Sequence, residues 1–266
     1  MNDLKKTLRK YKWYQTLGSI KYRIKTERRK QNASSRKIEA LRNSKNGKRC
    51  FIVGNGPSLS IDDLEMIKED DCFAVNRIYK IFNQTTWRPT FYFSQDEKVL
   101  EEIKDDIHSL FDECEGVFLN SSIYNHFKEI KRDNLYFMYV DYEDSYPELP
   151  NFSFDASKKI YEGFTVAYAC IQMAVYMGYS EIYIIGTDHN YNNQRLGDGT
   201  VVYDKTVLNY MPGLEGNTWY PPQLVKTTLA YRKSREVCEK NGVVIRNATR
   251  GGKLEEFERV DFDSLF

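Results

Sequence analysis

Residues 54–58, Gly54-Asn55-Gly56-Pro57-Ser58, have the composition of a turn that binds an anion between an apolar strand and a helix. Glycine allows close backbone approach or positive φ, and Pro57 fixes one dihedral. Ser60 suits the N-cap of the next helix, whose dipole and free backbone N–H groups would favour a phosphate. The segment fits neither G-x-G-x-x-G, because Leu59 replaces the third glycine, nor the P-loop. The turn predicts a nucleotide site of another type; the alternative is an ordinary turn that binds nothing.

Polar residues follow three further predicted strands, as Asn76-Arg77, Ser94-Gln95-Asp96 and residues 186–191. Ligands of open parallel sheets bind at the carboxyl ends of the strands, so we expect these groups to gather at one site. Their side chains suit ribose, base and phosphate. Each cluster alone is equally compatible with a helix cap or a turn.

His189 is the histidine best placed for chemistry, because it follows the sixth predicted strand directly beside Asp188. The carboxylate is expected to orient the imidazole and raise its basicity, and an unperturbed pKa near 6.5 suits a general base. The alternative is a turn with an exposed histidine. His108 and His126 lie in helical stretches and are predicted to be surface residues.

Short apolar strands alternate with amphipathic helices from residue 49 onward, which predicts an α/β fold: one Rossmann-like, doubly wound, mostly parallel sheet with helices on both faces. Helices are predicted over 98–111 and over 164–177, the latter central and buried. Two long interruptions, 141–160 and 187–222, have the length of functional lids, and the second is predicted to be a lid-like insertion. The predicted strands are 49–53, 72–75, 90–94, 116–119, 135–140, 181–186 and 243–247.

Charge is divided unevenly along the 266 residues: residues 1–49 hold 17 Lys and Arg against 3 Asp and Glu, and the remainder holds 22 against 35. We therefore divide the chain into a basic, helical N-terminal arm, 1–47, and a nucleotide-sugar-binding domain, 48–266. The arm could lie on anionic lipid, but its apolar positions split between two helical faces, so a solvated tail remains an alternative. Nucleic acid is not expected, because the arm carries no zinc-finger, helix-turn-helix or RNA-recognition signature.

Targeting and redox signals are weak. No apolar run approaches the roughly 20 residues of a membrane span, and the amino terminus lacks the apolar core of a signal peptide. The expected location is therefore cytoplasmic, and a peripheral position at the inner membrane face is left open. The five cysteines show no C-x-x-C spacing and are predicted to be buried hydrophobic residues.

The segments 54–58, 73–77 and 178–188, taken together, resemble the bacterial sialyltransferases of glycosyltransferase family 42. They also resemble the related 6-hydroxymethylpterin pyrophosphokinase-like proteins, which include motility-associated flagellin glycosyltransferases. The resemblance covers roughly residues 48–250. It implies a donor site in which Asn55, Gly56 and Ser58 lie beside the phosphate and ribose of CMP and Asn76 adds a contact. The full set of implied donor-binding residues is Gly54, Asn55, Gly56, Pro57, Ser58, Asn76, Ser94, Thr165, Gly186, Thr187 and Tyr191.

One departure from the sialyltransferase pattern affects the catalytic prediction. That family has a histidine in the late lid segment as general base, whereas residues 203–226 contain none. His189 and Asp188 are therefore the predicted catalytic residues. The tyrosine-rich segment 203–220 is the predicted cover, with Tyr203, Tyr210 and Tyr220 as possible donors to the phosphate.

The predicted function is transfer of a sialic-acid-like sugar from a CMP-activated donor to a saccharide or lipid-linked saccharide in bacterial surface polysaccharide or glycolipid biosynthesis. No metal or other cofactor is expected, because a monophosphate leaving group carries less charge than a diphosphate. One alternative is an ATP-dependent 6-hydroxymethylpterin pyrophosphokinase-like enzyme with Mg²⁺ at Asp96 and Asp188. A non-catalytic nucleotide-binding module is another, and a homo-oligomer is left open.

Overall fold

The computed structural model describes residues 33–127, 129–196, 198–217 and 220–266. Most of the predicted basic arm, residues 1–32, lies outside the described residues. The remainder of the arm packs on the domain: helix α2 (Ala33–Glu39) lies against strand β5, and Ile38 is buried in the core. The hydroxyl of Ser34 accepts a hydrogen bond from the backbone N–H of Phe137 at 3.2 Å.

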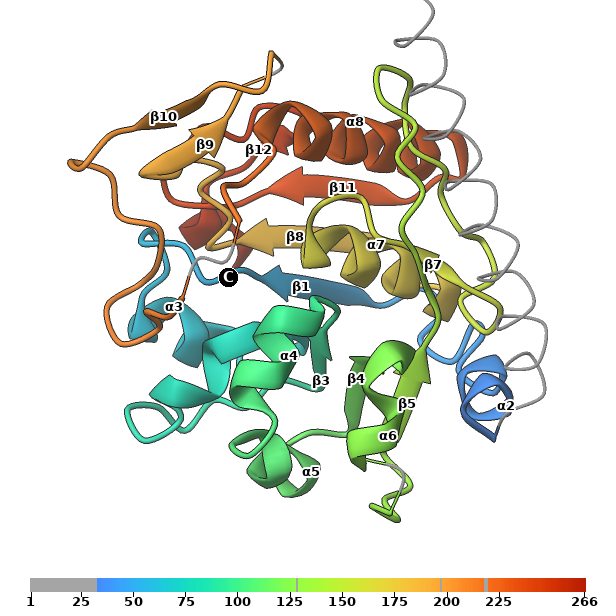
Figure 1. Ribbon diagram of the computed structural model, residues 1–266. Coiled ribbons are helices and arrows are strands. Elements are labelled where there is room, and N and C mark those ends of the chain that lie inside the picture. Colours follow the sequence, from blue (N-terminus) through green and yellow to red (C-terminus); the bar gives the residue numbers. More distant parts are fainter. Residues whose placement is uncertain (1–32, 128, 197, 218–219) are drawn as a thin grey trace, which may run out of the picture.

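Eight parallel strands form the central sheet in the order β12-β11-β8-β1-β2-β3-β4-β5, which confirms the predicted α/β fold. Successive strands after β1 are added on one side of it, whereas β8, β11 and β12 are added on the other. Their carboxyl ends point toward the side where a small hairpin lies (Figure 1). The sequence prediction missed β12, which has only two residues. The strands are β1 (Arg49–Val53), β2 (Asp71–Val75), β3 (Phe91–Ser94), β4 (Gly116–Asn120), β5 (Leu135–Met138), β8 (Glu181–Ile185), β11 (Val244–Asn247) and β12 (Glu258–Arg259).

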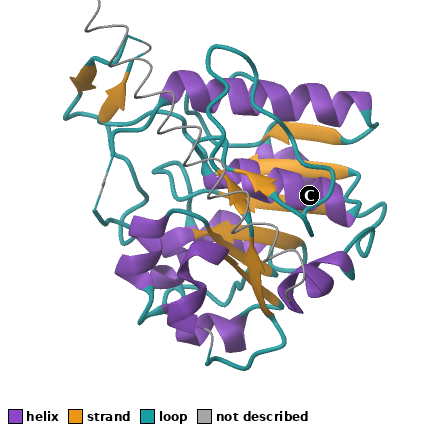
Figure 2. Ribbon diagram, turned by 45° about the vertical axis from the view of Figure 1, so that its right-hand side comes forward, coloured by secondary structure: helices purple, strands orange, loops and turns teal. Residues whose placement is uncertain are grey.

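Helices cover both faces of the sheet, and each face has its own apolar core (Figure 2). One face carries α2, α7 (Val166–Met177) and α8 (Leu224–Lys240). The other face carries the shorter helices, which are α3 (Ile61–Met66), η1 (Asn76–Ile81), α4 (Glu97–Ile103), η2 (Ile107–Ser109), α5 (Leu110–Glu113), η3 (Ser121–Ile123), α6 (Tyr124–Phe127) and η4 (Phe262–Leu265).

The two helices predicted with bounds have different outcomes. Helix α7 is buried almost all round, as predicted, and ends at Gly178 in the left-handed conformation (φ 89°). The helix predicted over 98–111 is wrong as a single element, because α4 ends at Ile103 and the chain turns before η2 and α5. Aspartate is a weak helix former, and the carboxylate of Asp106 in this turn accepts a hydrogen bond from the hydroxyl of Tyr79 at 2.8 Å.

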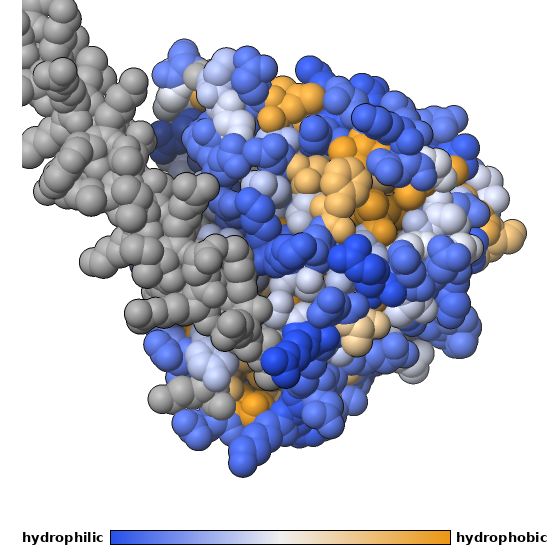
Figure 3. All heavy atoms as spheres, turned by 90° about the vertical axis from the view of Figure 1, so that its right-hand side faces the viewer, coloured by the Kyte–Doolittle hydropathy of each residue, from blue (hydrophilic) through white to orange (hydrophobic). Residues whose placement is uncertain are grey.

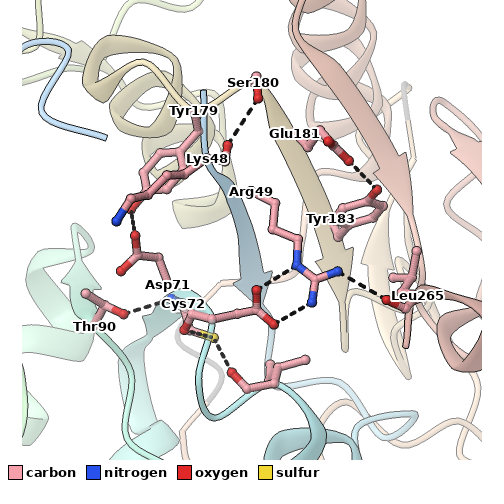
Figure 4. A network of polar contacts seen from close by, with 12 residues as sticks. Lys48, Arg49, Asp71, Cys72, Thr90, Tyr179, Ser180, Glu181, Tyr183 and Leu265 are labelled. Atoms are coloured by element: carbon pink, nitrogen blue, oxygen red, sulfur yellow. Dashed lines mark hydrogen bonds and ion pairs between the residues drawn. The ribbon is translucent and has the colours of Figure 1, made fainter. Parts of the chain in front are cut away.

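Ion pairs and hydrogen bonds join the amino ends of β1, β2 and β8 (Figure 4). Arg49 binds both carboxylate oxygens of Asp70 and donates to the carbonyl of Leu265. The carboxylate of Asp71 accepts hydrogen bonds from Tyr179 at 2.7 Å and from Lys45 at 3.0 Å. These contacts fix the end of the sheet opposite the carboxyl ends of the strands, where ligands are expected.

Both long interruptions contain short strands. The segment 141–160 is bounded by β6 (Val140–Asp141) and β7 (Ile160–Tyr161), which pair in parallel. The insertion 187–222 contains an antiparallel hairpin of β9 (Asn193–Arg195) and β10 (Val201–Tyr203).

The surface seen from the amino ends of the strands is mostly hydrophilic with separate apolar areas (Figure 3). All five cysteines are free and buried, as predicted. Among the described residues, no helix is both long enough and apolar enough to cross a bilayer.

Candidate functional site

A cavity of about 250 Å³ opens at the carboxyl ends of the strands, next to β1 and β8. The direction of strand addition reverses between these two strands, and open α/β sheets bind ligands at this point. Most of the predicted site residues line the cavity: Gly54, Asn55, Gly56, Asn76, Thr165, Gly186, Thr187, Asp188, His189 and Tyr191. The exceptions are Pro57, Ser58 and Ser94, which do not line it.

Three of the four backbone N–H groups in the turn at residues 54–58, which the sequence led us to expect to be free, are used within the protein. The N–H of Gly54 donates to the carbonyl of Ile185, and that of Gly56 to the carbonyl of Gly186, both at 2.8 Å. The N–H of Ser58 donates to the carboxylate of Asp188 at 3.3 Å. The turn is therefore fastened to the loop after β8. The short helix α3 does begin at its predicted N-cap, since the Ser60 hydroxyl accepts from the N–H of Asp63.

Asp188 supplies the negative charge that binds this turn from inside the protein. Its Oδ2 accepts a second hydrogen bond from the Ser58 hydroxyl at 2.8 Å. Burial raises the pKa of Asp188 above its ordinary value, and the two bonds from Ser58 oppose that shift. A Cβ on Gly56 would collide with this carboxylate, so glycine is required there. The prediction that Asp188 orients His189 is wrong, because its carboxylate is directed to Ser58.

His189 is held by α8 instead. Its Nε2 lies 2.8 Å from the hydroxyl of Thr228, which donates its only proton to the carbonyl of Leu224. Nε2 must therefore carry the imidazole proton, and Nδ1 is left as an acceptor. Nδ1 is buried without a hydrogen-bond partner among the described residues. Burial lowers the pKa of His189 to about 4, so the ring is neutral at pH 7.

Asn55 and Asn76 present amide groups from the ends of β1 and β2. The Nδ2 of Asn55 donates to the carbonyl of Val75 at 3.1 Å, and its Oδ1 is buried without a partner among the described residues. The Oδ1 of Asn76 accepts from the hydroxyl of Ser94 at 3.0 Å, which leaves the Nδ2 of Asn76 as its donor to a ligand. Ser94 thus orients Asn76 and does not itself line the cavity.

The amino terminus of α7 forms another part of the cavity wall, through Thr165, Val166 and Ala167. The Thr165 hydroxyl caps the helix by accepting from the N–H of Ala167. The N–H groups of Thr165, Ala167 and Tyr168 donate within the protein, so Val166 is the position at the start of this twelve-residue helix where the helix dipole favours an anion.

Backbone strain is concentrated around the cavity. Phe164, His189 and Asn76 adopt positive φ values of 59°, 53° and 51°, and all three line the cavity. Such conformations cost about 1–3 kcal/mol each and are typical of binding and catalytic sites.

A family model described as 6-hydroxymethylpterin diphosphokinase MptE-like matches residues 25–194. The chain belongs to the MptE-like family. A solved structure of the MAf glycosyltransferase from Magnetospirillum magneticum AMB-1 is similar to the chain, with a TM-score of 0.51 and 15% identity over 88% of it. The similarity shows a shared fold. The MptE-like chain covers only 39% of the length of the MAf structure.

A second solved structure is that of the sialyltransferase CstII from Campylobacter jejuni in complex with the substrate analogue CMP-3FNeuAc. Its TM-score is 0.44 at 18% identity, and the match covers 80% of this chain and 86% of the CstII chain. No curated protein sequence matches the MptE-like chain.

Sequence reasoning missed Glu162, which lines the cavity of this MptE-like protein two residues before Phe164. Burial raises the pKa of Glu162 to about 7. The backbone carbonyl of Glu162 accepts from the Nε2 of Gln95 at 3.1 Å, and the Oε1 of Gln95 is buried without a partner among the described residues. Glu162 follows a two-residue strand outside the main sheet, so no strand-end pattern marked it. The only available signal was its place just before the start of a buried helix.

The insertion folds back over the cavity of the MptE-like domain. The N–H of Met211 donates to the carbonyl of Asn55 at 2.9 Å, and Tyr210 lines the cavity. Arg77, which is 2% exposed, is fixed by a bidentate pair with Glu102 on α4. Its guanidinium also donates to the carbonyl of Asn217 and so holds the insertion. Tyr210 therefore occupies the predicted position in the cover, whereas Tyr203 and Tyr220, at the ends of that segment, are exposed and do not line the cavity.

Proposed function

We propose that this protein is a glycosyltransferase that binds a CMP-activated, sialic-acid-like sugar in the cavity and transfers the sugar to a hydroxyl of a saccharide. One observation carries the proposal: three buried acceptor atoms without partners among the described residues belong to cavity-lining side chains, namely Asn55 Oδ1, Gln95 Oε1 and His189 Nδ1. A buried acceptor without a donor costs about 1–3 kcal/mol, and a ligand rich in hydroxyl or amino groups would satisfy these atoms.

A nucleotide sugar matches both the unpartnered acceptors and the hydrogen-bond donors that line the cavity. Its ribose, base and sugar supply the hydroxyl and amino donors that these acceptors lack. Its phosphate is anionic, and the N–H of Val166 at the N-terminus of α7 and the Nδ2 of Asn76 would donate to it. Tyr210 and the segment around it would cover the reacting atoms and exclude water. The resemblance of the 54–58 and 178–188 segments to sialyltransferases favours CMP among the nucleotides.

The family description also supports the pyrophosphokinase alternative, which would need Mg²⁺ held by Asp96 and Asp188. Both residues line the cavity, but each already uses a carboxylate oxygen: Asp96 Oδ1 caps α4, and Asp188 Oδ2 binds Ser58. The described residues contain no group of three or more His, Cys, Asp or Glu side chains that could hold a metal ion. The fit to magnesium is therefore weak, and transfer without a metal is the version that we propose.

Thermal unfolding of the full chain with CMP, CDP, UDP, GDP and ATP, each with and without magnesium, separates these functions. We expect CMP to raise the unfolding temperature without magnesium, because a ligand at 100 times its Kd stabilises by about 2.7 kcal/mol. Asn76→Ala should lose this shift, whereas Glu97→Gln, an exposed change on α4 outside the cavity, should keep it. Stabilisation by ATP with magnesium alone would support the pyrophosphokinase instead.

A further inference from the structure

We infer that Glu162 is the general base of the reaction and that the acceptor hydroxyl enters at the wall formed by Glu162, Asp96 and Gln95. This inference rests on the proposed function and deepens it by naming the acceptor side of the same cavity.

Glu162 is held in place at both ends of its backbone unit. Its N–H donates to the carbonyl of Asp141 at 3.0 Å, and its carbonyl accepts from the Nε2 of Gln95 at 3.1 Å. Only Gly163 and Phe164, both at positive φ, separate it from Thr165, the N-cap of α7. Glu162 lines the cavity this close to the start of α7, and it therefore lies next to the site proposed for the phosphate.

The wall around Glu162 accepts hydrogen bonds and offers few donors. One N–H of the Gln95 Nε2 donates to the Glu162 carbonyl, and the Oε1 of this side chain, which is 4% exposed, has no partner among the described residues. Asp96 adds a carboxylate on the same cavity. A group that binds here must donate hydrogen bonds, and the hydroxyls of a saccharide do so.

The charges around Glu162 suit a base that works near neutral pH. Burial is the largest cause of its raised pKa of about 7, and the carboxylates of Asp96 and Asp144 add to it. The N–H of Phe164 and the charge of Lys226 on α8 oppose the shift. A base is most effective when its pKa lies near the working pH. His189, with a pKa of about 4, is a weaker base and is better suited to accept a hydrogen bond from the bound ligand through Nδ1.

In the transfer step, Glu162 takes the proton of the acceptor hydroxyl while the acceptor oxygen forms a bond to the anomeric carbon of the donor sugar. The bond between that carbon and the phosphate oxygen breaks, and its electron pair leaves with the CMP phosphate. The carboxylate is then neutral and loses the proton to solvent when the products leave.

The test measures CMP release from CMP-N-acetylneuraminic acid by the full chain between pH 5.5 and 8.5, with water as the acceptor. We expect the wild-type rate to rise through pH 7 as Glu162 loses its proton. Glu162→Gln should lower the rate at pH 8 by about 100-fold or more and abolish this pH dependence, since general bases contribute about 10²–10⁴-fold. Glu97→Gln, which removes an exposed carboxyl outside the cavity, should leave the rate unchanged.

The thermal shift with CMP and the unfolding midpoint are measured on the same variants. Glu162→Gln should keep the CMP shift, and its midpoint at pH 8 should equal or exceed that of the wild type, because it removes a buried charge. A variant that releases CMP within about threefold of the wild-type rate would overturn the inference and leave the proposed function intact. If the wild-type protein neither releases CMP nor is stabilised by CMP, the proposed function itself is overturned. If CMP stabilises the wild-type protein but no CMP is released from the donor, the transfer step and the role of Glu162 in it are overturned.

Discussion

The carboxylate of Asp188 accepts hydrogen bonds from both the hydroxyl and the backbone N–H of Ser58, at 2.8 and 3.3 Å, across 130 residues of sequence. The contact joins the loop after β8 to the turn after β1 at the point where the sheet reverses its direction of growth. It places a negative charge where the sequence pattern suggests a bound phosphate. The anion that Ser58 binds at this turn is thus part of the protein.

Removal of the Ser58 hydroxyl should weaken this junction. Ser58→Ala leaves Asp188 with one of its two bonds, and a hydrogen bond to a charged group contributes about 1.5–3 kcal/mol. We expect the free energy of unfolding, measured in urea, to fall by about 2 kcal/mol. Ser44→Ala, which removes an exposed turn hydroxyl, should change it by less than about 0.5 kcal/mol. Equal losses in the two variants would contradict this role of Ser58.

A methyl group at position 56 should disrupt the same junction by collision. In Gly56→Ala the new Cβ would meet the Asp188 carboxylate and lie 2.7 Å from the carbonyl oxygen of Gly186. Gly47→Ala is the matched variant, because Gly47 has a φ of 75° and open space around it, so it incurs only backbone strain of about 1–2 kcal/mol. We expect Gly56→Ala to lose more unfolding free energy than Gly47→Ala and to lose the thermal shift with CMP. A smaller loss at position 56 would argue against the tight contact.

The buried His189 should make stability depend on pH. Its pKa is about 4 in the folded protein and near 6.5 when unfolded, so the unfolded chain binds more protons between these values. Its contribution is present above pH 6.5 and is lost as the pH falls toward 4. In His189→Gln the decrease in unfolding free energy between pH 7 and pH 4.5 should be smaller by about 2 kcal/mol. His108→Gln, an exposed change, should follow the wild-type profile, and an unchanged slope in His189→Gln would refute the low pKa.

Arg77 should control the order of the insertion that covers the cavity. Its guanidinium binds both oxygens of Glu102 at 3.0 and 2.8 Å and the carbonyl of Asn217 at 3.1 Å, and lysine cannot reproduce this planar set of donors. We expect Arg77→Lys to speed hydrogen exchange of the backbone amides in 208–217 and to lower the affinity for CMP. Arg88→Lys alters a more exposed pair with Glu113 and should leave exchange in 208–217 unchanged. Identical exchange in the wild type and in Arg77→Lys would show that other contacts hold the segment.

Local patterns in the sequence predicted most of the framework. The main strands were found because runs of apolar residues must be buried on both faces of a parallel sheet. The start of α3 after its N-cap, Ser60, and the burial of α7 were also predictable, because N-caps and apolar periodicity depend only on neighbouring residues. The clustering of Asn76 and Gly186 at one cavity followed from the rule that the carboxyl ends of parallel strands meet, whereas Thr165 was implied by the resemblance to the sialyltransferases.

The partners of the charged groups were decided only by the tertiary structure. Asp188 is adjacent to His189 in sequence, yet its carboxylate binds Ser58, because the two loops that follow β1 and β8 are brought into contact by the pairing of those strands. Glu162 gained a pKa of about 7 from burial and from carboxylates on other segments, and no nearby pattern of residues encodes such an environment. The sequence by itself determined the sheet and the edge at which ligands bind. Which side chains are free to act at that edge depends on hydrogen bonds and burial between distant segments, and only the folded chain creates them.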